Sequence, residues 1–199
     1  LDVVALRPEL PAAAAQRVAI GLADRVDDLI DKVMMTPQDR QAAYEAVAEW
    51  PDDKSPEYAY ARASLAGRLA EIRGLSAVNL LAELERYARR SMVLDPKWRD
   101  GAARRMLGTL YVLAPASVLQ HGDSEEGLSL LQEQVEAHPD NPTNHLRLAE
   151  GFLALSDPEP AHELLCHVME HEAELRPSEK RLAKTLVDSL GGKSELLCE

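Results

Sequence analysis

Apolar residues recur every three or four positions along most of this chain of 199 residues. Between Ala12 and Met34, for example, Val18, Leu22, Val26 and Leu29 fall on one helical face. Steps of three and four are the period of an amphipathic α-helix. The pattern therefore predicts a long first helix over residues 12–34, and similar steps predict further helices down to residue 190.

Proline and polar capping residues divide this pattern into separate helices. Thr36-Pro37 and Ser55-Pro56 each combine an N-cap with a proline at the first helical position, and Asp123 is expected to cap a later helix. The helices predicted after the first span residues 37–50, 56–74, 80–94, 98–113, 123–138, 142–155, 158–173 and 178–190. Pro51, Pro96 and Pro139 each close the second helix of a pair, which gives about four helical pairs.

Two consecutive stretches carry the same residue pattern. Three positions recur 41 residues apart and two recur 34 apart: Leu107/Leu148, Gly108/Ala149, Tyr111/Phe152, Gly127/Ala161 and Leu131/Leu165. A leucine, a small residue and an aromatic, then small-x-x-x-apolar and Pro139, resembles the tetratricopeptide repeat, a helix-turn-helix unit of 34 residues. A small residue at Gly108 is expected to let the neighbouring helix approach closely, with Tyr111 filling the groove.

The resemblance implies an all-α fold of right-handed superhelical (solenoid) type. We expect about four helical pairs plus a C-terminal capping helix in a single domain over residues 1–192, followed by a flexible tail over residues 193–199. Only 4% of the residues are aromatic, so Leu, Ala and Val must supply the packing, which also suits close helix pairs.

The first copy of the repeat is seven residues longer than the second, and the extra residues fall in an apolar turn between Ala114 and His121. Loops that depart from a repeat's period often carry function. The candidate residues in this insertion are Pro115, Val118, Leu119 and His121.

In the tetratricopeptide family the first helix of each pair lines a concave groove that binds a protein or peptide. The resemblance, carried over by position, implies a groove formed by Arg105, Thr109, Val112, Leu146, Glu150 and Leu153. Each of these could equally belong to ordinary packed or solvated surface. The set lacks the cluster of Lys, Asn and Arg with which some family members clamp a C-terminal carboxylate.

A second resemblance covers about residues 75–190. The residues that carry it are the long first helix, Arg89-Arg90 before Leu94-Asp95-Pro96, the stretch 107–111, Ala114-Pro115 and Gly122-Asp123. Together they look like the T component of tripartite ATP-independent periplasmic transporters, bacterial helical-repeat proteins that partner a substrate-binding protein. This resemblance implies an accessory protein that binds a small ligand or such a partner.

The formal net charge is −12, and most of it lies in the second half of the chain. Residues 1–105 carry 16 Lys/Arg against 17 Asp/Glu, whereas residues 106–199 carry 6 against 17. This charge disfavours nucleic acid and anionic lipid and favours a basic or neutral partner, although acidic side chains also simply keep a surface soluble. The basic residues concentrate between Arg86 and Arg105, where pairing with acids one helical turn away is the favoured interpretation.

Cys166 and Cys198 are too few for a disulfide framework and are expected to be free thiols. No run of 18 apolar residues predicts a transmembrane segment. The location stays open between cytoplasm and, if a leader was removed ahead of Leu1, periplasm.

His167 to His171 matches H-x-x-E-H, in which two histidines bind zinc and a glutamate activates water. His162 with Cys166 could also hold a metal ion, but zinc sites need three or four ligands and both sets offer two. Packing and solvated surface are the favoured interpretations. The sequence as a whole predicts a non-enzymatic scaffold without cofactor or metal, which binds a protein or peptide alone or as a homo-oligomer.

Overall fold

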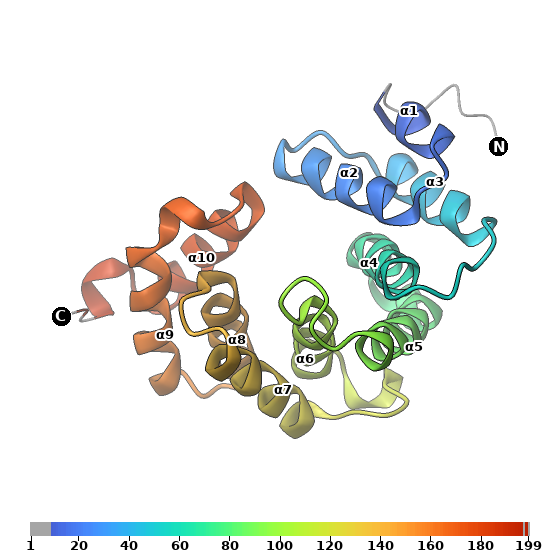
Figure 1. Ribbon diagram of the computed structural model, residues 1–199. Helices are drawn as coiled ribbons and strands as arrows, with labels where there is room; N and C mark the ends of the chain where they lie inside the picture. The colour runs from blue at the N-terminus through green and yellow to red at the C-terminus, as the bar shows by residue number, and fades with distance from the viewer. Residues whose placement is uncertain (1–8, 197, 199) are drawn as a thin grey trace. The chain divides into compact units, whose positions relative to one another are not determined.

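A computed structural model describes residues 9–196 and residue 198, and it is helical throughout (Figure 1). Within this described part of the chain there are ten α-helices and no strand, which confirms the all-α prediction. The chain divides into two compact units, residues 1–98 and residues 99–199. Each unit is described by itself below, and the single array expected over residues 1–192 stays a prediction.

The first unit contains five helices and the second unit contains the other five. Those of the first are α1 (Glu9–Ala15), α2 (Ala19–Asp31), α3 (Pro37–Ala48), α4 (Pro56–Arg73) and α5 (Val78–Leu94), with a 3₁₀ turn η2 (Gly74–Ala77) before α5. Those of the second are α6 (Ala102–Leu113), α7 (Ser124–Ala137), α8 (Pro142–Ala154), α9 (Glu159–Glu170) and α10 (Pro177–Ser189), with the 3₁₀ turns η3 (Ala116–Val118), η4 (Glu172–Glu174) and η5 (Lys193–Glu195).

The predicted N-caps are confirmed. Thr36 Oγ1 accepts from the Asp39 backbone N–H at 3.2 Å while the Asp39 carboxylate accepts from the Thr36 N–H at 2.9 Å, which makes a complete capping box. Ser55 Oγ accepts from the Tyr58 N–H at 3.0 Å, and Asp123 Oδ1 accepts from the Glu126 N–H at 2.9 Å. These bonds satisfy backbone donors that the helix itself leaves free, and so they fix where α3, α4 and α7 begin.

The single long helix expected over residues 12–34 is wrong, because the chain breaks between α1 and α2. Arg17 adopts a left-handed conformation with φ of 54°, and Val18 is about half exposed. The break lets α1 pack against both α2 and α3 and buries Leu10 in the same core as Leu22. A straight helix would carry Leu10 away from that core.

The helix expected from residue 98 begins only at Ala102, because three consecutive residues take the left-handed conformation. Arg99, Asp100 and Gly101 have φ of 48°, 53° and 72°. Residues other than glycine rarely adopt this conformation. Gln134 of α7, almost fully buried, holds the turn by donating a hydrogen bond from Nε2 to the Asp100 carbonyl.

Helices α6 and α7 pack backbone to backbone at the position that the repeat pattern predicts. A Cβ added to Gly108 would lie 3.0 Å from the Gly127 carbonyl, and one added to Gly127 would lie 3.0 Å from the Gly108 carbonyl. Tyr111 is buried beside this contact. In the first unit a Cβ added to Gly67 of α4 would lie 3.0 Å from Leu84 Cδ1, a side-chain atom of α5, so that this contact does not bring the two backbones together.

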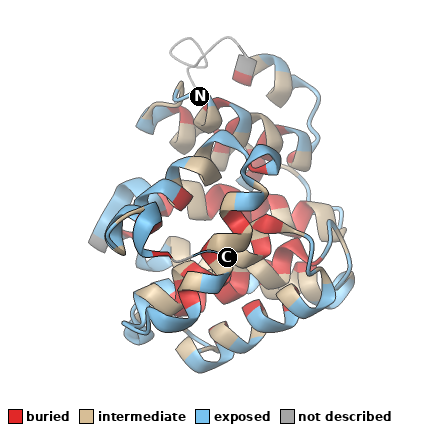
Figure 2. Cartoon of the chain, turned by 90° about the vertical axis from the view of Figure 1, so that its left-hand side faces the viewer, coloured by how far each residue is buried: buried red, intermediate tan, exposed pale blue. Residues whose placement is uncertain are grey.

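Each unit has its own apolar core. Figure 2 shows the buried residues of the chain along the inner faces of the helices. In the first unit the core gathers around Val26, Val47 and Leu65. In the second unit α8, α9 and α10 pack around Leu146 and Leu165. None of the helices within the described residues combines the length and apolar character that crossing a membrane requires.

Candidate functional site

The predicted groove begins at Arg105, which the structure places between α6 and α8. Its Nη1 donates to Asn144 Oδ1 at 2.8 Å, and Asn144 is completely buried at the start of α8. Asn144 Nδ2 donates in turn to the Gln134 carbonyl at 3.1 Å. Arg105 therefore joins α6, α7 and α8 as part of the structure, and only its half-buried outer surface remains for a partner.

Three further groove residues, Thr109, Glu150 and Leu153, are half-buried. Thr109 Oγ1 donates to the Arg105 carbonyl at 2.9 Å within α6, and Glu150 accepts from Arg147 Nη1 at 2.8 Å within α8. Leu153 packs on the edge of the second unit's core. These side chains can present hydrogen-bonding and apolar surface, but each already has a partner inside the unit.

Val112 and Leu146 lie in the core and so cannot line a surface groove. Leu146 is 0% exposed among α8, α9 and α10, and Val112 is 6% exposed against Leu131 and Leu148. The family pattern assigns these positions to the open side of the array. Here neighbouring helices cover them, because α6 packs against α8 as well as α7 and α10 packs against α8.

The insertion lies where the repeat period predicts it, in the connection from α6 to α7, which runs over residues 114–123 where the α8–α9 connection spans only residues 155–158. It contains η3. Pro115 and His121 are exposed, while Val118 and Leu119 are half-buried. Gly122 at its end lies directly against the Tyr111 ring, so that a Cβ there would overlap the ring.

Three histidines of the second unit form a stack. The ring centroids of His145 on α8 and His167 on α9 are 3.8 Å apart with an interplanar angle of 21°, and those of His167 and His171 are 4.3 Å apart at 25°. His145 Nε2 donates to the Pro139 carbonyl at 2.6 Å, and His171 Nδ1 donates to the His167 carbonyl at 3.0 Å. Among the described residues, the buried His145 Nδ1 and His167 Nε2 have no hydrogen-bond partner.

This stack does not have the geometry of the H-x-x-E-H zinc motif. Imidazole lone pairs lie in the ring plane, and nearly parallel planes do not direct their nitrogens at one point. Over the described residues, no group of three or more His, Cys, Asp and Glu side chains is arranged to hold a metal ion. Burial lowers the pKa of His167, and charge on His145 or His171 lowers it further. The neutral form of His167 is therefore favoured.

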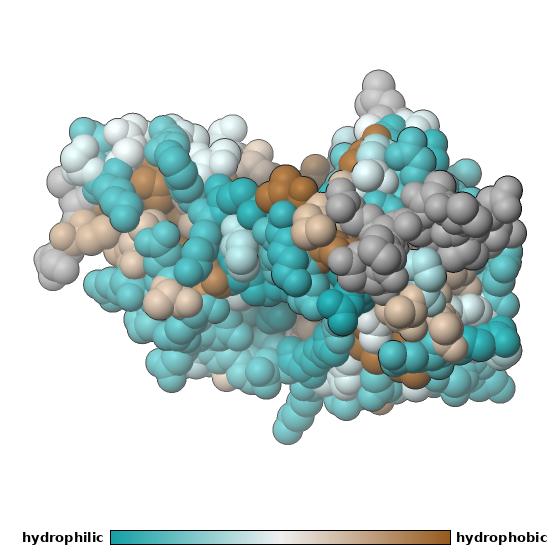
Figure 3. Space-filling view, turned by 90° about the horizontal axis from the view of Figure 1, so that it is seen from above, coloured by the Kyte–Doolittle hydropathy of each residue, from teal (hydrophilic) through white to brown (hydrophobic). Residues whose placement is uncertain are grey.

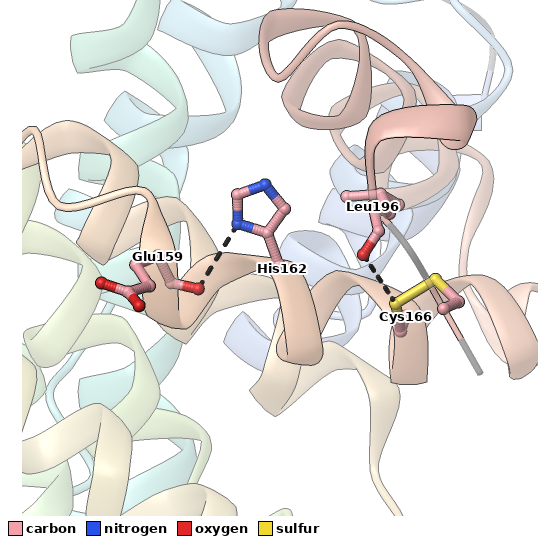
Figure 4. Close-up of a disulfide and its surroundings, with 5 residues drawn as sticks. Glu159, His162, Cys166 and Leu196 are labelled. Atoms are coloured by element: carbon pink, nitrogen blue, oxygen red, sulfur yellow. Dashed lines mark hydrogen bonds between the residues drawn. A yellow bond between two sulfur atoms is a disulfide. The ribbon is translucent and has the colours of Figure 1, made fainter.

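The two cysteines are not free thiols, contrary to expectation. Cys166 of α9 and Cys198 form a disulfide, with their Cα atoms 5.5 Å apart (Figure 4). Leu196, two residues before Cys198, lies in the core of α8, α9 and α10 and is only 3% exposed. The segment expected to be a flexible tail is thus held at Leu196 and at Cys198. Pairing depended on how α10 returns the chain to α9, which cysteine count alone does not reveal.

A buried ion-pair network in the first unit was missed at the sequence level. Arg62 of α4 donates to Glu83 of α5 and lies over the Tyr87 ring, 4.9 Å from its centroid. Tyr44 of α3 donates to the same Glu83 carboxylate at 2.6 Å. Burial, together with this hydrogen bond, raises the pKa of Tyr44 to about 12. The available signal was the position of Arg62 in the apolar stripe that continues to Leu65.

Two arginines of the basic cluster, Arg90 and Arg104, pair with acids that are distant in sequence. Arg90 donates to both oxygens of Asp52, a residue 38 positions earlier, and this hydrogen bond is the main reason the pKa of Asp52 is lowered. Arg104 Nη1 lies 3.5 Å from Glu133 Oε2. Arg90 therefore ties α5 to the connection between α3 and α4, and Arg104 ties α6 to α7.

In sequence comparison, no known family model matches this chain, and no characterised protein matches it either.

Proposed function

We propose that this chain is a non-enzymatic scaffold of tetratricopeptide type whose second unit binds a protein or peptide segment. The observation that carries the proposal is the repeated hairpin. In both hairpins the leucine and the small residue of the pattern are buried, and in α6–α7 the small residue lies at the close approach of the two helices. Helical hairpins that repeat in this way stack into superhelical arrays whose faces bind extended segments.

The charge of the second unit indicates a basic partner. Residues 99–199 carry 9 Lys/Arg against 18 Asp/Glu. A depression of about 570 Å³ at the α7–α8 turn is lined by Asp100, Asp140 and Glu174, and no Lys or Arg is among its described lining residues. Figure 3 shows a face on which hydrophilic residues predominate and apolar patches are small, which suits a polar, exchangeable contact.

Two surfaces of the second unit can be compared in one experiment. A random peptide library displayed on phage is selected against the full chain, and an enriched peptide is synthesised for affinity measurement. We expect enrichment of Lys- and Arg-containing peptides. Glu150→Lys tests the α6–α8 face that the repeat predicts, and Asp140→Lys with Glu174→Lys tests the depression.

One of these two variants should weaken binding of the synthetic peptide by about tenfold or more, since close opposite charges become like charges. Glu163→Lys, an exposed substitution on α9, is the matched control and should bind as the unaltered chain does. Far-ultraviolet circular dichroism verifies the fold of each variant. The proposal fails if no peptide is enriched over a carrier protein, or if both variants bind with unchanged affinity.

The disulfide favours a second candidate, an accessory protein outside the cytoplasm similar to the T component of tripartite transporters. Disulfides persist in oxidising compartments such as the periplasm. In this alternative the half-buried Val118 and Leu119 of the insertion contact a small apolar ligand. Native mass spectrometry after mild purification should then show a bound small molecule that denaturation releases. A single apo mass under those conditions would count against it.

A further inference from the structure

A short segment that follows α10 is held against the second unit by a buried leucine and a disulfide. We name the residues Lys193–Leu196 together with Cys198 the latch segment. Leu196 inserts among the apolar side chains of α8, α9 and α10, and Cys198 is bonded to Cys166 in the middle of α9 (Figure 4). Within the described part of this segment, Lys193, Ser194, Glu195 and Cys198 are exposed.

The chain can reach this position because two glycines follow α10. Gly191 and Gly192 have φ of 97° and 99°, a region in which side-chain-bearing residues are strained. The Gly192 N–H donates to the Val187 carbonyl at 3.0 Å, which closes the end of α10. The segment then turns back to α9, so its ordered position is a return path and not a continuation of a helix.

Among the described residues of the latch segment, Leu196 is the one side chain that is buried, and the others are exposed. Ordering a segment costs backbone and side-chain entropy at every residue, and a single buried leucine offsets only a fraction of that cost. The Cys166–Cys198 bond closes a loop with a sequence separation of 32, which removes much of the freedom that a released segment would gain. The covalent bond is therefore what keeps Leu196 in the core.

We propose that the latch segment is a redox-controlled cover over the α9–α10 side of the second unit's core. In the oxidised chain the disulfide holds it closed. Reduction releases the segment and uncovers apolar side chains that are now only partly buried. Those that belong to the same core cluster and lie on α9, on α10 or at the end of α10 are Leu164, Met169, Leu182, Leu186 and Leu190.

The chemistry is thiol–disulfide exchange with a dithiol reductant. A thiolate of the reductant attacks the exposed Cys198 Sγ, and the bond to Cys166 Sγ breaks, so that Cys166 leaves as a thiolate and takes up a proton. The second thiol of the reductant then attacks the mixed disulfide and releases Cys198 as a thiol. Two electrons pass to the chain, and the reductant leaves as a disulfide. Cys198 is the sulfur attacked because it is exposed and Cys166 is half-buried.

Limited trypsin digestion of the full chain, with and without dithiothreitol, tests the proposal. We expect cleavage after Lys193 to become at least about tenfold faster in the reduced chain, because proteolysis follows the population of the open state. Lys184 within α10 is the internal control, and cleavage there should keep its rate. Thiol titration in denaturant should find no free thiol before reduction and two after it.

Two variants separate the covalent latch from the apolar contact. Cys166→Ser with Cys198→Ser should be cleaved rapidly after Lys193 with or without dithiothreitol. Leu196→Ala, in which the disulfide remains, should stay slow until dithiothreitol is added. Equal rates after Lys193 for the oxidised and reduced chains overturn the proposal, as does slow cleavage of the double variant or the finding of two thiols in the unreduced chain. If the double variant loses its helical circular dichroism, the comparison of oxidised and reduced unaltered chain decides alone.

Discussion

Gly108 and Gly127 show how a single residue sets the distance between two helices. The Cβ that alanine would place at Gly127 lies 2.8 Å from Tyr111 Cβ and 3.0 Å from the Gly108 carbonyl, and neither atom can rotate away. We therefore expect Gly127→Ala to lower the free energy of unfolding by about 1–3 kcal/mol, the usual cost of overpacking. Urea denaturation followed by circular dichroism measures this.

Gly151→Ala on α8 is the matched control. Its Cβ would meet side-chain atoms no closer than 3.3 Å, and alanine favours a helix interior over glycine by about 1 kcal/mol. The control should leave stability unchanged or raise it slightly. Equal losses of unfolding free energy in the two variants would show that the α6–α7 contact does not specifically require glycine.

Residue roles were predictable from sequence where the local pattern decides them. The close approach at Gly108 was predicted because a small residue recurs at a fixed place before an aromatic. Val112 and Leu146 were assigned to a surface, and both are buried, because burial depends on which helices pack beside them. Arg62 was missed because its partner could not be identified from the local pattern. A cation in an apolar stripe needs a buried acid, and here the acid is Glu83 on another helix.

The two helical hairpins of the second unit differ in one equivalent contact between their helices. In α6–α7, Arg104 forms an ion pair with Glu133. The corresponding positions of α8–α9, 41 and 34 residues later, are His145 and His167, whose rings stack. The same cross-helix position therefore holds a charge pair in one hairpin and a titratable ring pair in the other.

Acid should weaken the α8–α9 hairpin more than the α6–α7 hairpin. His145, His171, Glu170 and Asp140 surround His167, and burial followed by the two histidines sets the direction of the shift. A lowered pKa means that the unfolded chain binds the proton more readily. Stability from neutral His167 is thus present above the ordinary histidine pKa of about 6.5 and is lost as pH falls through the folded value.

The free energy of unfolding should consequently fall between about pH 7 and pH 5, the window around the ordinary histidine pKa, and His167→Gln should reduce that fall. His162→Gln on the same helix removes a histidine outside the stack and should leave the fall unchanged. Denaturation curves at several pH values provide the measurement. If the two variants behave alike, the stack is not the acid-sensitive element.

Helix positions were predictable from sequence to the extent that caps and prolines mark them. Thr36, Ser55 and Asp123 each begin the helix expected after them. The breaks at residue 17 and at residues 99–101 were not predicted, because Arg17, Arg99 and Asp100 adopt left-handed conformations that residues other than glycine rarely take. Tertiary contacts compensate for the cost of such conformations, and the local sequence pattern does not reveal those contacts.

At the scale of the whole molecule, each unit has an apolar core of its own. The first is built from α1 to α5, and the second from α6 to α10. We expect the fragment of residues 99–199 to fold alone, with a helical circular dichroism spectrum and a cooperative thermal transition. A fragment without a cooperative transition would instead favour the continuous array that the repeat pattern predicts over residues 1–192.

The helical class, the hairpins and the insertion could be predicted from sequence because they rest on periodicity and spacing. The disulfide could not, since residues 166 and 198 meet only after α10 has formed and the chain has reversed at Gly191 and Gly192. The partner is likewise outside the reach of pattern alone, because recognition depends on which side chains remain uncovered after the helices have packed.

The left-handed turn at residues 99–101 also has a kinetic consequence. Its hydrogen bond comes from Gln134, which belongs to the following helix, so the turn gains its support only after α7 has docked on α6. Folding of the second unit is then expected to start within the α6–α7 hairpin and to extend backwards to its own first turn. Amide hydrogens at the start of α6 would be the last of that helix to gain protection during refolding and the first to exchange in the native state.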